Sequence, residues 1–178
     1  GFFRPPFSGR NFYTRWGLST QPPRGIAAID GSSGTVRWST GQDQNDPQRL
    51  LNVPLGDPVP ANGLLYHLEW SSLNDVNQGR GRELNLVCLD TTRGNTQWRA
   101  PIASAGRESD LTASLERSLP AFAIYGNSVT VAGGAVYSSS NSGLIARSDI
   151  RDGRTDWIYH YDPIPPTDRT VLNHGSTP

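Results

Sequence analysis

The chain has 178 residues, which is long enough to bury a core and, by length alone, predicts one domain. Its 16 basic and 16 acidic residues balance, so no overall charge recruits nucleic acid or an anionic membrane. A single cysteine excludes an internal disulfide framework, and no segment has the apolar length of a membrane span.

The first elements that the sequence predicts are strands. Asn11–Trp16 is one candidate, and Gly25–Ile29 is a short apolar run that leads to Asp30. A polar loop follows, closes at Gly34 and returns toward Trp38. Glycine can adopt the positive φ that closes a bulged turn, and an aspartate can accept hydrogen bonds from loop N–H groups. The segment is therefore predicted to form a β-hairpin.

This hairpin belongs to a repeated pattern, Asp-x-x-x-Gly-x-x-x-Trp, with a period of about 60 residues. The three copies are Asp30, Gly34 and Trp38; Asp90, Gly94 and Trp98; and Asp149, Gly153 and Trp157. Each copy follows a short, mostly apolar run. We interpret all nine residues as structural: the hairpin places a tryptophan at a fixed height, where it packs one sheet on its neighbour. The three rings are accordingly expected to be largely buried.

Further strand candidates precede the second and third copies, at 61–70 and 126–140, with the turn dipeptides Asn-Gly and Gly-Gly beside them. Each repeat then holds about four strands, which is the content of a propeller blade. Between these two repeats, Leu111, Leu115 and Leu119 follow a possible N-cap at Asp110, and this spacing predicts one short amphipathic helix.

The fold class predicted is all-β, with about three four-stranded antiparallel blades that make an incomplete propeller. The approximate blades are 1–55, 56–118 and 119–161, and 162–178 reads as the lead-in to a further blade. Three such sheets do not close a ring, since closed propellers typically need at least four. We therefore expect the chain to be a piece of a larger propeller protein, or its ring to be completed by another chain.

The residues before each aspartate carry a family resemblance. "IAAIDGSSGTVRW" and "LVCLDTTRGNTQW" resemble the blade ends of pyrroloquinoline-quinone-like (PQQ-like) repeat β-propellers, which have apolar-Ala-apolar-Asp, a glycine turn and a tryptophan. Cys88 takes the small position, where we interpret it as a buried thiol. The third copy departs, with Arg147 at the small position and Ser148 at an apolar one. The longer arrangement is also similar to large PQQ-like repeat proteins of planctomycete bacteria.

The resemblance raises the hypothesis of a quinoprotein dehydrogenase. Such an enzyme needs calcium ligands, a carboxylate base and cationic contacts to the quinone, and many members add a disulfide between adjacent cysteines. This chain has one cysteine, and its Asp and Trp residues are accounted for by the blade motif. His67, His160 and His174 lack metal-ligand spacing. We predict no catalytic residue, no bound cofactor and no metal site in this chain.

Two functions follow from the resemblance. The favoured one is a non-catalytic propeller that acts as a rigid scaffold for protein–protein interaction in an extracytoplasmic assembly, in the periplasm or at the cell surface. An outer-membrane assembly lipoprotein that is similar to this family provides the comparison. Its partners would be other protein chains or the remaining blades of the parent protein, with no nucleic acid and no membrane span. The alternative is a fragment of a PQQ-dependent oxidoreductase whose active site lies in blades not present here.

Overall fold

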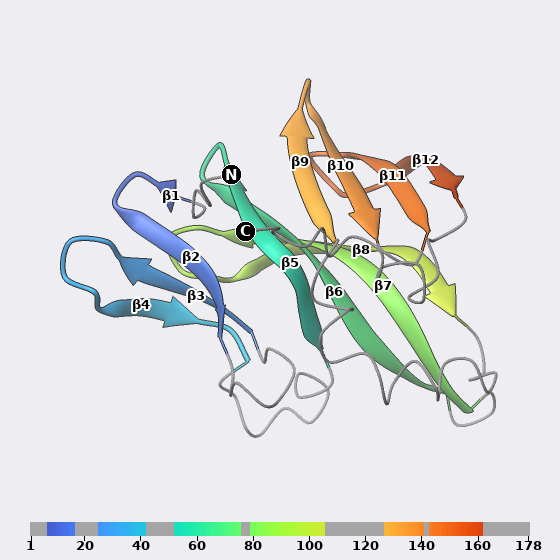
Figure 1. Cartoon of the computed structure of the whole chain (residues 1–178), viewed down its shortest axis with the longest axis horizontal. Helices are drawn as coiled ribbons and strands as arrows, with labels where there is room; N and C mark the ends of the chain where they lie inside the picture. Colours follow the sequence, from blue (N-terminus) through green and yellow to red (C-terminus); the bar gives the residue numbers. More distant parts are fainter. Residues whose placement is uncertain are drawn as a thin grey trace, which may run out of the picture.

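The computed structural model describes residues 7–16, 25–41, 52–75, 79–105, 127–140 and 143–161. In these ranges the chain forms twelve strands, arranged as three four-stranded sheets whose neighbouring strands are antiparallel (Figure 1). Each sheet uses four strands that are consecutive in the sequence, so each repeat builds one blade. This confirms the predicted all-β, incomplete propeller.

The blades take their strands in chain order. Blade 1 consists of β1 (Phe7–Ser8), β2 (Asn11–Trp16), β3 (Gly25–Asp30) and β4 (Val36–Ser39). Blade 2 consists of β5 (Val53–Ala61), β6 (Leu64–Asp75), β7 (Gly79–Asp90) and β8 (Thr96–Ala105). Blade 3 consists of β9 (Ser128–Ala132), β10 (Ala135–Ser140), β11 (Leu144–Asp149) and β12 (Thr155–His160).

Two sequence-based predictions, a blade boundary and a helix, are compared with the strands as follows: the first falls inside a strand, and the second falls on residues that the structure does not describe. The approximate boundary at residue 55 lies inside β5, which begins at Val53. The amphipathic helix expected after Asp110 lies outside the described residues. Across the described ranges, no helix has the length and apolarity needed to cross a membrane.

Blade 2 lies between the other two blades and has a different partner on each face (Figure 1). Strand side chains alternate between the faces of a sheet. On β6, Tyr66 and Leu68 therefore face blade 3, while Leu65, His67 and Glu69 face blade 1. The two faces of one strand thus contribute to two separate interfaces.

The interface between blades 2 and 3 is an apolar core. Its buried residues are Leu55, Tyr66, Leu68, Leu84, Leu86, Cys88 and Ile102 from blade 2, and Val129, Val136, Leu144 and Ala146 from blade 3. The core between blades 1 and 2 is smaller and consists of Tyr13, Ile26, Ala28, Leu65, Val87 and Leu89, with Trp38 packed against it. Burial of these side chains is what holds the sheets face to face.

Strand β5 approaches the start of blade 3 through a glycine. The pairing of β5 with β6 shifts register between Leu55 and Val59, and Gly56 in this irregular stretch has φ of +64°. A β-carbon on Gly56 would lie 2.2 Å from the carbonyl oxygen of Asn127. Only glycine permits both the positive φ and this contact, so Gly56 sets how closely blades 2 and 3 meet.

Candidate functional site

The same turn closes the last hairpin of every blade. In each copy the glycine N–H donates to the aspartate carbonyl: the distances are 2.7 Å for Gly34, 2.9 Å for Gly94 and 2.9 Å for Gly153. The aspartate N–H in turn donates at 2.9 Å to the carbonyl five residues on, in Thr35, Asn95 and Arg154. The glycine φ values are +71°, +73° and +74°. The three copies are therefore alike in geometry as well as in sequence.

The aspartate side chains hold these turns. Oδ1 of Asp90 accepts hydrogen bonds from the backbone N–H groups of Thr92 and Arg93, at 2.8 and 2.9 Å. The same role is taken by Asp30, which accepts from the N–H groups of Ser32 and Ser33 at 2.9 and 3.2 Å. An aspartate fits here because its short carboxylate reaches the loop donors two and three residues ahead.

Two of the aspartates also meet an arginine. Hydrogen bonds from Ser32 and Arg37 hold the pKa of Asp30 well below its usual range. Arg151 does the same for the pKa of Asp149, to whose Oδ2 it donates at 2.8 Å. Both carboxylates are therefore ionised at neutral pH and act as charged acceptors.

The tryptophans occupy equivalent places in β4, β8 and β12, and the first two contact the next blade. The Trp38 ring packs on Gly94 of blade 2, and its Nε1 donates to the carbonyl of Thr91 at 2.9 Å. The Trp98 ring packs on Gly153 of blade 3. The motif residues thus come together between blades: the tryptophan of one copy meets the glycine of the next.

Trp157 departs from the expectation that all three rings are largely buried. It is 45% exposed, whereas Trp38 and Trp98 are partly buried. The difference follows from position, since a tryptophan of this motif is covered by the blade that comes next. In the described part of the chain, no blade follows β12.

A tyrosine on the second strand of each blade contacts the tryptophan of the same blade, and it was not among the residues predicted from the sequence. The rings of Tyr13 and Trp38 are 6.0 Å apart, those of Tyr66 and Trp98 are 5.9 Å apart, and those of Tyr137 and Trp157 are 6.4 Å apart. Between each pair lies the small position of the motif, occupied by Ala28, Cys88 and Arg147. Each tyrosine is the third residue of its strand, a position that can be recognised only when the strand bounds are known.

Blade 3 presents an exposed aromatic face on the side away from blade 2. Trp157 and Tyr159 of β12 lie opposite Arg147 and Ile145 of β11, so these four side chains share one face. Tyr159 is 62% exposed and Ile145 is 36% exposed. The opposite face of the sheet carries Val136, Leu144 and Ala146, which are buried against blade 2. Within the described ranges, blade 3 is thus covered by blade 2 on one face and exposed on the other.

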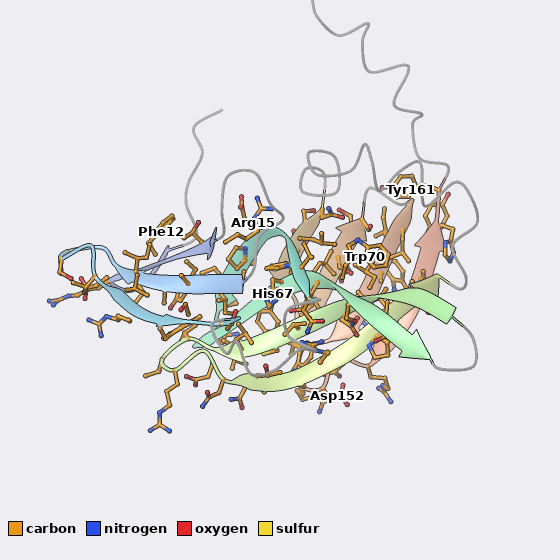
Figure 2. The ribbon with its side chains drawn as sticks, turned by 90° about the horizontal axis from the view of Figure 1, so that it is seen from below. Phe12, Arg15, His67, Trp70, Asp152 and Tyr161 are labelled. Carbon is orange, nitrogen blue, oxygen red and sulfur yellow. The ribbon has the colours of Figure 1, made fainter. Side chains whose placement is uncertain are left out.

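A polar cavity of about 380 Å³ lies between blades 1 and 2. Blade 1 contributes the ends of β3 and β4, and blade 2 contributes residues of β5, β6, β7 and β8 and the turn at Gly94. Figure 2 shows His67 near the middle of the molecule, where these two blades meet. Because Trp38 packs on Gly94, the cavity borders the ring contact between the two blades.

Four ionisable residues of blade 2 line this cavity. Glu69 Oε1 lies 2.8 Å from the guanidinium of Arg99, and Glu69 Oε2 lies 3.6 Å from His67 Nε2. His67 is 2% exposed and Glu69 is 7% exposed. Arg93, in the turn, adds a second guanidinium to the lining. From the sequence, His67 was considered only as a metal ligand, and nothing linked it with Glu69 or Arg99.

In the described ranges, no three His, Cys, Asp or Glu side chains gather in a way that could hold a metal ion.

Solved structures of quinoproteins and of BamB are similar to the chain. Quinohemoprotein alcohol dehydrogenase ADHIIG from Pseudomonas putida HK5 matches 86% of this chain at 14% identity, with a TM-score of 0.52. The corresponding enzyme from Comamonas testosteroni matches 89% at 15% identity and 0.46, and BamB from Moraxella catarrhalis matches 84% at 19% identity and 0.42. The first likeness shows a shared fold alone.

The chain spans only part of these proteins: 25% of the Pseudomonas enzyme, 20% of the Comamonas enzyme and 38% of BamB. No protein among curated sequences matches it significantly. A family model does: PQQ_2, described as outer membrane protein assembly factor BamB, matches residues 24–177. That stretch holds all three copies of the Asp-x-x-x-Gly-x-x-x-Trp motif and most of the three blades. The chain therefore belongs to this PQQ-like repeat propeller family.

Proposed function

We propose that this chain is a non-catalytic propeller scaffold whose open third blade docks further polypeptide in an extracytoplasmic or cell-surface assembly. The observation that carries the proposal is the exposed face of Trp157, Tyr159 and Ile145. Large apolar side chains gathered on one exposed surface are typical of an interaction site.

The two interfaces inside the chain indicate what this face receives. Trp38 and Trp98 are each seated on the glycine of a following Asp-x-x-x-Gly turn. Trp157 occupies the same place in its own hairpin, and its ring is exposed. The partner we propose is therefore another four-stranded sheet with the same turn, contributed by the parent protein or by a neighbouring subunit.

The open face of blade 3 also differs in charge from the corresponding faces of blades 1 and 2, which carry Trp38 and Trp98. Arg147 stands opposite Trp157, where blades 1 and 2 have Ala28 and Cys88, and it forms an ion pair with Asp156. An aromatic centre bordered by such a pair has the composition of a protein interface, with apolar anchors and a polar rim. This supports a neighbour that is not a copy of blade 2 or blade 3.

The cellular location is part of the same proposal. The family model bears the name of an outer membrane assembly factor. That name supports placing the scaffold outside the cytoplasm, in the periplasm or at the cell surface, with protein chains as its partners.

Sedimentation velocity of the 178-residue chain tests the docking face. We expect the wild-type chain to sediment as associated species and the Trp157→Glu variant to shift toward the monomer, because a charge at the centre of an apolar interface opposes docking. Gln97→Glu, at an exposed position of β8, is the matched control and should leave association unchanged. A wild-type chain that stays a compact, cooperatively melting monomer contradicts the proposal.

A second experiment separates the scaffold from the oxidoreductase. The complete protein is assayed for dye reduction with alcohols or sugars after addition of the quinone and calcium. We expect no turnover above that of the quinone alone. Turnover that requires the protein would assign it to the oxidoreductases instead.

A further inference from the structure

The charged residues in the cavity between blades 1 and 2 can be compared with the residues at equivalent positions of blade 3. His67 and Glu69 stand one and three residues after Tyr66, and Arg99 stands one residue after Trp98. Counting from Tyr137 and Trp157 in the same way, blade 3 has Ser138, Ser140 and Ile158. A blade of this protein thus packs on its neighbour without charged groups at these positions. The propeller fold does not account for the three side chains of blade 2.

Holding ionisable groups in an interface is costly unless each one is paired. Glu69 is paired with Arg99 and lies 3.6 Å from His67 Nε2, but one buried atom of the imidazole is left without a partner. His67 is 2% exposed, and its Nδ1 has no hydrogen-bond partner among the described residues. Arg93 lines the same cavity at an exposed position and makes no ion pair within the described part of the chain.

The lining has the charge and shape of an anion site. Two guanidinium groups, of Arg93 and Arg99, stand against the single carboxylate of Glu69, which leaves one positive charge before His67 is counted. Guanidinium groups bind carboxylate and phosphate oxygens through paired N–H donors. The side chains of Val87 and Leu89 form part of the wall as well, so the cavity also offers contacts to carbon.

We propose that this cavity binds a small organic carboxylate, with Arg93 as the cation that pairs with it and the imidazole of His67, beside Glu69, as part of the wall that surrounds it. The cavity volume of about 380 Å³ is within the range of small-molecule sites and far above the space of one water. The site is separate from the proposed docking face, which lies on blade 3.

Calorimetric titration of the whole chain tests the ligand class with three probes. Succinate is the small carboxylate, succinamide is its uncharged counterpart, and inorganic phosphate is an anion without carbon. We expect succinate to bind with measurable heat, succinamide not to bind, and phosphate to bind more weakly than succinate. Equal binding of succinate and succinamide, or no binding of succinate, overturns the proposal, and phosphate as the tightest ligand overturns the carboxylate class.

Variants test the residues. Arg93→Gln should weaken succinate binding about tenfold, as expected for the loss of one charge-assisted hydrogen bond. Arg93 is exposed, so the variant is expected to fold. Arg154→Gln is the matched control: it removes one guanidinium from an exposed position at the blade 3 turn and should not change the affinity. An equal loss of succinate affinity in both variants would show that only the overall charge matters, and it would contradict the proposed site.

The role of His67 is read without mutating a buried residue. The chain has three histidines, whose ring signals can be followed by NMR during the succinate titration. We expect the His67 imidazole signals to shift with saturation, and those of His160 to stay in place. Unchanged His67 signals at saturating succinate would place the ligand elsewhere and overturn the proposal.

Discussion

The indole of Trp38 lies against Gly94 of the next blade so closely that a β-carbon on Gly94 would fall 2.5 Å from its Cε3 atom. Trp98 and Gly153 repeat this relationship at the second interface, again with 2.5 Å to the nearest ring carbon. The ring needs a neighbour without a side chain, and the turn needs a residue with positive φ. One glycine meets both needs, which explains why the motif couples glycine to tryptophan.

Two matched substitutions distinguish the stability that glycine contributes through the ring contact from the stability that it contributes through the turn. Gly34 has the same turn and a φ of +71°, but a β-carbon there would meet nothing within 4 Å. Gly34→Ala should therefore cost only the backbone strain, about 1 to 2 kcal/mol. Gly94→Ala adds overpacking against Trp38, a further cost of about 1 to 3 kcal/mol. Urea denaturation measures both, and equal losses would show that the ring contact does not matter.

Replacement of Trp98 is expected to cost more stability than replacement of Trp157. Trp98 is partly buried and packs against the core between blades 2 and 3, so Trp98→Ala should cost about 3 kcal/mol, the low end for loss of a large ring. Trp157 is 45% exposed, and Trp157→Ala should cost no more than about 1 kcal/mol in the dilute chain. Chemical denaturation at low protein concentration gives both values. A larger loss for Trp157 would contradict the assignment of its face as open.

The sequence predicted those parts of the blade that lie within one hairpin. The residues from aspartate to tryptophan span a turn of fixed length, so their spacing is constant and visible. The tyrosines that contact the same tryptophans were hidden. Tyr13 precedes Asp30 by 17 residues, Tyr66 precedes Asp90 by 24, and Tyr137 precedes Asp149 by 12. The connection between the second and third strands differs in length from blade to blade, so no period marks the tyrosine.

The clustering of charged residues at the cavity could not be predicted from the sequence for a related reason. His67 and Glu69 share a face of β6 by simple alternation, but Arg99 reaches Glu69 only through the pairing of three strands. That pairing shifts register between Cys88 and Leu89, which no count of residues reveals. The exposure of Trp157 likewise depends on whether another sheet packs against blade 3, which the residues of the hairpin do not determine.

The turn of blade 1 predicts a loss of stability in acid. Hydrogen bonds from Ser32 and Arg37 lower the pKa of Asp30 below its ordinary value of 3.8, so the folded state favours the carboxylate. The stability that it contributes is complete above pH 3.8 and is lost as the pH falls below that value. Asp30→Asn should be less stable at neutral pH and should lose less on acidification. Urea denaturation across this range checks it, and parallel curves for the two proteins would contradict it.

The buried pair of Cys88 and Tyr66 predicts a loss of stability in alkali. Burial raises the pKa of the Cys88 thiol from 9.0 to about 11 and that of Tyr66 from 10.0 to about 12. Both groups are neutral when protonated, so the folded state favours the proton, and stability is complete below pH 9 and lost as the pH rises toward 11. Cys88→Ala places there the residue that blade 1 has, at Ala28. Its stability should fall less between pH 9 and 11 than that of the wild type, and identical losses in denaturation experiments would show that Cys88 ionisation is not the cause.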